Sequence, residues 1–525
     1  MKKNYLVLSL LFVSLLANAQ VIEPTHFRGA FAEAGSTDWT DNWAEWDPQF
    51  KPYPNTTTTV QTDITSNTTW NSGDVILLKN KVYVTNNAVL TIQPGCVIRG
   101  DKATEGTLII GRGSKIIADG TATNPIVFTS NYDTAQRAVG DWGGVIILGK
   151  GIMNQGTAVV EGGLDTAKAR YGGVDSLDNS GILRYVRIEF AGYPFQPDKE
   201  INGLTFGAVG KGTTVDYVQC SFTNDDSFEW FGGNVNCKHL ISYSTVDDDF
   251  DTDFGYSGHV QFGLIIRDPE LSDQAASSTS EGFESDNDGQ GSNNQPQTKA
   301  VFSNITMVGP YRGNTASALP ANADFKRCIR IRRNSAISVL NSIFTNFNQG
   351  VSIEGAGCED NATGDTIQFK NNTFASIKND DTCSVLTGST FNINQWFANN
   401  NNNYFTSSTS IGWVNPYPEL WEKPDYRLNV GSPMLSVKDI TNIITVNAYP
   451  NPTENSVTIE FISKSNCSAN YIITDIVGNE VMNEKANFIV GKNIETIDLT
   501  NCANGMYFIN LKVDTENKPI KIVKN

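Results

Sequence analysis

The sequence predicts an all-β protein, in which a parallel β-helix, or solenoid, is followed by a small β-sandwich. Three observations lead to this fold class. Apolar residues occur in short alternating runs separated by turns rich in Gly, Asn, Asp, Ser and Thr, and helical periodicity is almost absent. The runs recur at a spacing of roughly 20 to 25 residues, which is typical of a solenoid. Near residue 440 the residue pattern changes to one that predicts a compact module of alternating strands.

The repeat is clearest between residues 215–236 and 237–258, where a shift of 22 positions aligns Asp225 with Asp247. A coil of this length cannot bury its apolar face alone, so coils are expected to stack at the strand spacing of about 4.8 Å. A β-sandwich or a propeller with accidental internal similarity is the alternative.

The N-terminus predicts export. Residues 1–19 are interpreted as a signal peptide, with a positively charged start, an apolar stretch too short to span a bilayer and an A-x-A cleavage signal. Residues 20–58 are rich in aromatic side chains, and we expect them to form a cap over the open end of the solenoid. An aromatic ligand platform is the alternative. The β-helix itself is expected over residues 59–438.

Charge favours cations as partners. The formal net charge is −17, and Asp225 to Asp288 holds 15 acidic residues against only Lys238 and Arg267. Nucleic acid and anionic membranes are poor partners for such a surface. No segment after the signal peptide has the roughly 20 apolar residues of a membrane span, so the mature chain is expected to lack one.

The chain has eight cysteines, which could all pair in an exported protein. Cys358 with Cys383 and Cys467 with Cys502 are the favoured local pairs, although sequence cannot choose among the connectivities. The spacings do not suggest zinc, because no C-x-x-C motif is present.

Residues 444–525 are expected to form an immunoglobulin-like β-sandwich. The module contains Tyr449-Pro450-Asn451-Pro452, the segment "DIVGNEV", Gly505-Met506-Tyr507-Phe508 and a basic ending. In these motifs it resembles the C-terminal sorting domain of the Bacteroidota type IX secretion system. The resemblance implies transfer across the outer membrane by the type IX machinery, after passage through the periplasm, and then release or surface attachment. An ordinary immunoglobulin-like appendage is the alternative.

The body contains "LTIQPGCVIRGD", "DWGGVIILG" and "DDSFEWFGGNVNCKHLIS" within residues 27–290. In these segments it resembles a group of Bacteroidota exported proteins with a right-handed parallel β-helix. This resemblance implies a fold and a location, and it implies no chemistry.

The acidic segment carries the candidate metal site. If residues 246–255 form a strand, alternation places four of its aspartates on the outer face. Stacked coils would then set carboxylates about 5 Å apart, where they hold a proton, gain a basic neighbour or bind a cation. Calcium accepts roughly 6–8 oxygens and is the expected cofactor, with a solvated acidic face as the alternative. The candidate ligands are Asp225, Asp226, Glu229, Asp247, Asp249, Asp251 and Asp253.

A weaker calcium candidate is a loop that contains Glu284, Asp286 and Asp288 followed by glycine. A flexible solvated loop is the favoured interpretation here, because Glu replaces the usual leading Asp and no bidentate Glu closes the motif. Residues 274–297 and 399–403 are both expected to be polar loops that project from the coils.

Two functions fit these features. The first is a secreted or cell-surface protein without catalytic activity, whose flank is stabilised by calcium and binds a glycan or another surface component. The second is a calcium-dependent polysaccharide lyase or another carbohydrate-active enzyme, an analogy from fold alone. A lyase would need a base, for which Arg267, Arg330 and Arg332 are candidates. The simpler interpretation of these arginines is that they neutralise neighbouring carboxylates.

Overall fold

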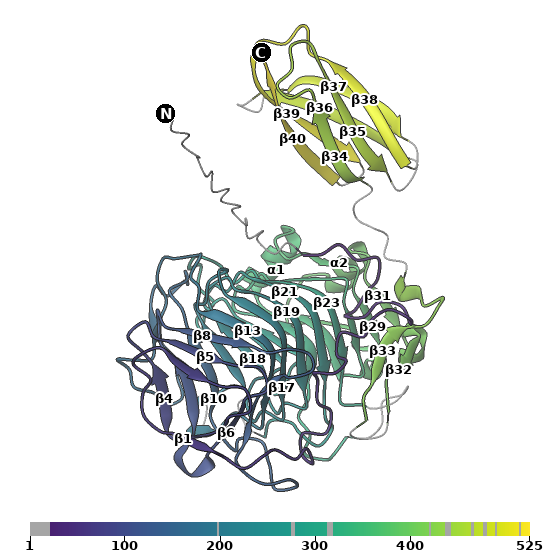
Figure 1. The fold of residues 1–525 in the computed structure, drawn as a ribbon. Coiled ribbons are helices and arrows are strands. Elements are labelled where there is room, and N and C mark those ends of the chain that lie inside the picture. Colours follow the sequence, from purple (N-terminus) through teal and green to yellow (C-terminus); the bar gives the residue numbers. More distant parts are fainter. Residues whose placement is uncertain are drawn as a thin grey trace, which may run out of the picture. The chain divides into compact units, whose positions relative to one another are not determined.

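The computed structural model describes residues 22–196, 199–274, 279–311, 319–418, 422–435, 443–463, 467–475, 480–488, 491–513 and 516–525. The chain forms two compact units, Met1–Val437 and Lys438–Asn525. The expected signal peptide, residues 1–19, lies outside the described residues. In the first unit, parallel strands are stacked side by side in successive coils (Figure 1).

One parallel sheet has ten strands, ordered along the chain without interruption. They are β4 (Lys81–Val84), β7 (Thr107–Ile110), β10 (Gly144–Leu148), β16 (Leu204–Gly207), β18 (Phe228–Phe231), β20 (Phe250–Asp253), β22 (Phe283–Ser285), β24 (Arg327–Ile331), β27 (Gln349–Ile353) and β30 (Cys383–Val385).

The second sheet has 17 strands. They are β1 (Thr58–Val60), β2 (Thr68–Trp70), β3 (Val75–Leu78), β5 (Val89–Ile92), β6 (Val97–Gly100), β8 (Lys115–Asp119), β9 (Ile126–Ser130), β13 (Gly181–Glu189), β17 (Thr214–Ser221), β19 (Asn236–Tyr243), β21 (His259–Ile266), β23 (Val301–Val308), β25 (Ser338–Leu340), β26 (Ile343–Thr345), β28 (Phe369–Lys370), β29 (Thr373–Ala375) and β31 (Asn403–Phe405).

Shorter elements lie between these strands or follow the last of them. They are β11 (Ala158–Val159), β12 (Arg170–Tyr171), β14 (Pro194–Gln196), β15 (Lys199–Glu200), β32 (Trp413–Asn415), β33 (Asp425–Leu428), α1 (Ala356–Thr363) and α2 (Ile393–Asn399).

The strand register confirms the β-helix predicted from the repeat. Thr214 pairs with Asn236 and Phe228 pairs with Phe250, which is the shift expected from the sequence. The apolar residues of successive coils therefore form continuous inward columns. Phe228, Phe250 and Phe283, for example, are all fully buried in one core that runs through the coils.

Each long strand of the 17-stranded sheet bends at one residue with a left-handed backbone. Tyr217 and His239 have φ of 55° and 48°, and the ladder of paired residues skips both positions. Because an L-residue with positive φ cannot continue a strand, the bend divides the sheet into two faces. With the ten-stranded sheet, each coil thus has three sides.

The aromatic N-terminal segment, predicted to cap the open end of the solenoid, instead runs along its flank. Arg28 Nη1 donates to Thr373 Oγ1 at 2.7 Å, and Tyr53 donates to Glu189 on β13, several coils away. Its Trp43, fully buried, packs with outward apolar residues of the coils. The prediction was wrong because apolar side chains also point outward from the flank of the coils, and the N-terminal segment buries them. We call residues 22–54 the strap.

The two expected polar loops are also partly built into the coils. Residues 283–285 form β22, which the sequence pattern did not indicate. Within residues 399–403, Asn402 is buried and accepts a hydrogen bond from Asn372 N at 2.8 Å. Asparagine at such positions bonds from coil to coil, so its polarity does not place it in solvent.

Cysteines in the described residues do not form the expected pairs. Cys358 and Cys383 are free thiols, and so is Cys502, so its predicted bridge to Cys467 is absent. Cys220, Cys237 and three further solenoid cysteines are buried in the apolar core, where a thiol acts as a small apolar group, and Cys383 is partly buried against it.

The C-terminal unit consists of two antiparallel sheets. One contains β34 (Ile443–Tyr449), β35 (Ser456–Ser463) and β38 (Gly491–Asp498), and the other contains β37 (Glu480–Phe488), β36 (Cys467–Asp475), β39 (Gly505–Val513) and β40 (Glu516–Lys524). Buried Ile459, Ile473 and Ile509 belong to its core. The unit is a β-sandwich, and its immunoglobulin-like topology stays a prediction.

Replacing Trp43 by alanine should lower the free energy of unfolding by about 3–5 kcal/mol, because a fully buried indole leaves a cavity. Urea denaturation followed by circular dichroism measures this change. The control is Val174→Ala, whose parent side chain is 90% exposed, with an expected change within about 0.5 kcal/mol. Equal stabilities of the two variants would contradict the packing of Trp43 between the strap and the coils.

Candidate functional site

The outward face of the ten-stranded sheet carries one continuous column of paired residues whose chemistry changes along the solenoid. The column consists of Tyr83, Ile109, Ile146, Thr205, Glu229, Asp251, Glu284, Arg330, Ser352 and Ser384. Its first part is apolar and packs in a cluster with Val160 and Tyr171, near β11 and β12. Its middle is acidic, and its last part combines arginine with serine.

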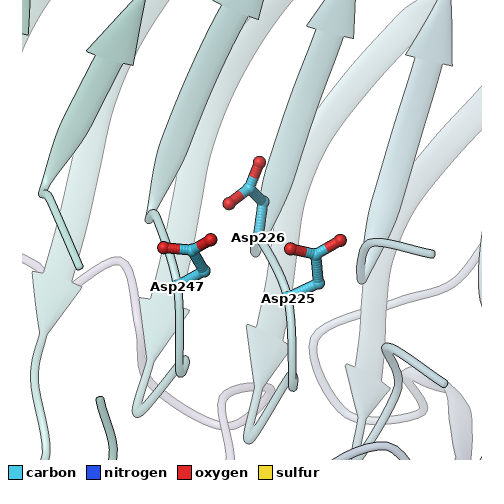
Figure 2. Close-up of side chains that lie close together, drawn as sticks. All are labelled: Asp225, Asp226 and Asp247. Carbon is cyan, nitrogen blue, oxygen red and sulfur yellow. The ribbon is translucent and has the colours of Figure 1, made fainter. Parts of the chain in front are cut away.

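Two groups of carboxylates converge beside this acidic part. Oxygens of Asp225, Asp226 and Asp247 lie within 4.8 Å of one another, and so do oxygens of Asp226, Glu229 and Asp251. Figure 2 shows the first group at the turns that lead into β18 and β20, with the three carboxylates close together and projecting to the same side. Asp226 belongs to both groups. We call them the two acidic triads.

Backbone hydrogen bonds hold the triads in place. Asp248 N donates to Asp226 Oδ1 at 2.9 Å, and Glu281 N donates to Asp248 Oδ1 at 2.6 Å. Each turn thus uses an aspartate of one coil to bind the amide of the next. The side chain of Asn202 donates to Glu229.

Burial and mutual repulsion raise the pKa of these carboxyl groups. For Asp226 the larger cause is loss of solvent, and the charges of Asp225 and Asp248 add to it. The pKa of Glu229 is raised well above its usual range by burial and then by the charge of Asp251. A carboxyl group in this state retains a proton or needs a cation nearby.

The structure does not place Asp249 or Asp253 with the other predicted ligands, and Asp253 Oδ1 instead accepts a hydrogen bond from Phe254 N at 2.6 Å. Asp249 is fully buried, accepts a hydrogen bond from Ser242 and lies 3.3 Å from Arg267 Nη1. The outward assignment failed because β20 begins only at Phe250, so strand alternation does not apply to the preceding turn. Burial raises the Asp249 pKa to about 6 although Arg267 opposes this.

Arg267 is likewise no candidate base at the surface. It is 1% exposed, and its Nη1 donates to the carbonyl of Asp247 at 2.7 Å. Its guanidinium also lies 5.1 Å from the ring centre of Phe325. Arg267 therefore supports the turn that carries Asp247.

Arginines neutralise the carboxylates of the following coils. Arg330 lies 3.0 Å from Glu284 and 3.2 Å from Glu354, and Arg332 lies 2.9 Å from Asp286. This bears out the simpler interpretation of these arginines. It also gives Glu284 and Asp286 a role other than that of a calcium loop.

Asp288 serves a tight turn. Its Oδ1 accepts from the amides of Gln290 and Ser292 at 2.9 and 3.0 Å. Burial acts to raise the Asp288 pKa, but these hydrogen bonds outweigh it and the net pKa is lowered. Residues 285–288 are buried, so the expected flexible solvated loop is wrong for them, whereas Gly289, Gln290 and residues 293–295 are exposed.

Several members of the network were missed by sequence reasoning. Strict strand alternation would turn Asp248 inward, and the coils that carry Glu281 and Arg327 follow pairings of Phe250 with Phe283 and of Phe283 with Ile329, which are not separated by the 22 residues of the repeat. The segment "KRCIRIRR" was the available signal for the arginines, but their partners depend on the coil register.

A pocket with a volume of about 690 Å³ lies beside the arginines. Its lining includes Arg330, Arg332, Arg333, Asn334 and Glu354, together with the start of α1. We call it the arginine pocket. Its volume falls within the range of roughly 300–1,000 Å³ of small-molecule sites, and its charged side chains offer many hydrogen-bonding groups.

The predicted sorting motif joins the two ends of the C-terminal unit. Asn451 Nδ2 donates to the carbonyl of Lys521 at 2.9 Å, and Val523 N donates to Asn451 Oδ1 at 2.9 Å. Tyr507, two residues after Gly505 in β39, donates to the carbonyl of Ala503. Pro450 and Pro452 flank Asn451, and Tyr449 donates to Glu460 at 2.9 Å.

Each of the two units matches the model of a known protein family. Residues 447–525 match the secretion system C-terminal sorting domain. This match implies handling by the type IX secretion system, with export and then secretion or attachment to the outer surface. Among the described residues, no helix is long and apolar enough to cross a membrane. Among curated proteins, none matches this sequence.

Two phage tailspikes are similar among solved structures. The enzymatically active domain of tailspike protein 4 from bacteriophage CBA120 is 12% identical with a TM-score of 0.23, and the match covers 86% of this chain. This chain spans 63% of the length of that domain. The Dettilon tailspike protein is 8% identical with a TM-score of 0.23, and the match covers 84% of this chain and 87% of the tailspike.

The first unit matches a family model over most of its length. Residues 62–416, more than half of the chain, match the pectate-lyase-like beta helix domain. The stacked parallel coils provide the structural counterpart of this match. The chain therefore belongs to the pectate-lyase-like beta helix family.

Proposed function

We propose that this exported protein binds calcium at the two acidic triads, and that the calcium-stabilised flank of its β-helix binds a glycan or another surface component. The observation that carries the proposal is the convergence of five carboxylates, with Asp226 shared, within 4.8 Å in each triad. The sorting domain supports a location in which such a flank meets extracellular partners.

The donor set suits calcium. Each triad offers three carboxylates, and calcium accepts roughly 6–8 oxygens from carboxylates, carbonyls and water. The raised pKa values of Asp226, Glu229 and Asp251 mean that these groups are destabilised as bare anions. A divalent cation would relieve this repulsion, because it favours the charged form of every carboxylate around it.

The lyase alternative lacks support from the arginines that were its candidate bases. Arg267 is buried, and Arg330 and Arg332 are ion-paired. Burial lowers the pKa of Arg330 and Arg332, but facing carboxylates, with Glu284 foremost, outweigh it, so the net pKa of both is raised. A guanidinium stabilised as a cation is a poor acceptor for a proton.

The route of export is the second part of the proposal. We infer a Bacteroidota source and passage through the periplasm, guided by an N-terminal signal peptide. The support is the Tyr449–Pro452 motif together with the A-x-A pattern at Ala17–Ala19.

In the presence of a chelator, the carboxyl groups with raised pKa should make the body less stable as pH rises above about 4, where the unfolded chain loses protons that the folded chain retains. For Asp249 and Glu281 this loss is complete above the folded pKa values of about 6 and about 7. For Asp226 and Glu229 it continues to higher pH.

Calorimetric unfolding between pH 4 and 8 measures this loss. The double variant Asp226→Asn/Glu229→Gln should lose less stability than the wild type over this range, whereas Glu270→Gln, at an exposed position, should match the wild type. Identical pH profiles of the double variant and the wild type would contradict the raised pKa values.

Calcium should bind the chelator-treated protein with a dissociation constant at or below about 1 mM, the upper range of extracellular calcium sites. Isothermal titration calorimetry measures this directly. At a hundredfold excess of calcium over the dissociation constant, the free energy of unfolding should rise by about 2.7 kcal/mol. Asp226→Asn should weaken binding at both triads, because this residue is shared.

Glu229→Gln should weaken only the second triad, and Glu270→Gln should leave the titration unchanged. The absence of heat up to millimolar calcium would reject the calcium site. If the Asp226→Asn variant gave the same heat of calcium binding as the wild type, the calcium site would lie outside the triads.

A further inference from the structure

The arginine pocket borders a charge network that is balanced within itself. Four guanidinium groups meet four carboxylates in an alternating arrangement. The members are Arg327, Arg330, Arg332 and Arg333 with Glu281, Glu284, Asp286 and Glu354.

Each cation in this network is already engaged. Arg327 lies 2.6 Å from Glu281, and Arg333 lies 2.7 Å from Asp286. Glu354 is buried and lies 3.1 Å from Arg327 and 3.2 Å from Arg330. The arginines therefore present no net positive charge to a ligand, although their number suggests a site for polyanions.

We propose that the arginine pocket binds an uncharged, hydroxyl-rich saccharide in preference to a uronate or sulfated one. This inference rests on the proposed glycan-binding function and names its ligand class. The balanced network, the additional carboxylate of Asp360 in the pocket lining and the nearby acidic triads leave a negative local charge. A polyanionic chain would be repelled, or would have to break buried ion pairs at a considerable free-energy cost.

Sugar hydroxyls avoid this cost. A hydroxyl group both donates and accepts, a carboxylate has about four acceptor sites and a guanidinium has five N–H donors, so each ion pair retains hydrogen-bonding capacity. Hydroxyls can therefore bond to the sides of the existing pairs and leave the charges matched. Asn293 in the lining adds a neutral amide group, whose Oδ1 accepts a hydrogen bond from Asn334 Nδ2.

Isothermal titration calorimetry of the protein with defined hexasaccharides tests the ligand class. The neutral probes are the hexaoses of cellulose, mannan, laminarin and xylan, and the anionic probe is hexagalacturonate, each in chelator and in calcium. At least one neutral hexaose should bind in both conditions, and hexagalacturonate should give no heat in chelator. Binding of hexagalacturonate alone would overturn the preference and leave glycan binding intact, whereas no binding at all would reject both.

Variants locate the binding. Ala356 is exposed at the start of α1 and lines the pocket, so Ala356→Trp should fill the pocket and weaken neutral hexaose binding at least tenfold. Val174→Trp, on a residue that is 90% exposed and outside the pocket lining, should bind like the wild type. Unchanged affinity in Ala356→Trp would place the saccharide elsewhere.

A charge variant separates this inference from the calcium proposal. The double variant Glu354→Gln/Asp360→Asn leaves four arginines against three carboxylates at the pocket, so hexagalacturonate should bind measurably in chelator, where calcium plays no part. The thermal midpoint of this variant checks that the coil remains folded. A folded Glu354→Gln/Asp360→Asn protein that still rejects hexagalacturonate would contradict the role given to charge balance.

Discussion

The in-register stacking of parallel coils is the constraint on which the rest of this structure depends. Backbone hydrogen bonds between coils place each side chain beside its counterpart about 4.8 Å away. Stacking of like residues benefits apolar and amide side chains, as for Phe228 beside Phe250 and for Asn402 beside Asn372. For carboxylates the same geometry is unfavourable, because two anions at this distance repel each other.

Two neighbouring parts of one column solve that problem in different ways. From Glu284 onward, arginines of the next coil lie beside the carboxylates, and Glu284 and Asp286 each have two guanidinium groups within ion-pair distance. At Glu229 and Asp251, the neighbours in the column are themselves acidic or uncharged. Raised pKa values follow there from the same stacking that buries the core. The acidic triads and the balanced network are thus two outcomes of a single repeat.

The strap covers aromatic side chains that the bends of the coils direct outward. Left-handed residues bend each long strand, and they direct aromatic side chains such as Tyr185, Tyr217 and His239 outward, where their rings stack with centroid distances of 4.4 and 4.2 Å. Such an apolar column would be exposed on an unprotected solenoid. Trp43 contacts both tyrosine rings edge-on, so the segment that precedes the coils completes their flank.

The sequence alone determined the repeat, the acidic segment and the sorting motif, because each is a local pattern of residue types. The 22-residue shift placed Glu229 beside Asp251 correctly, since coils of equal length keep their register. The same shift does not predict the position of Glu284, because its coil is longer, and it does not predict the arginine partners of Glu284.

Only the tertiary structure decided which carboxylates face a cation and which face one another. Asp249 shows this most clearly: strand alternation turned it outward, whereas the turn before β20 directs it to buried Arg267. The direction of a side chain in a turn depends on backbone angles set by the neighbouring coil, and the linear pattern of residues does not contain that information.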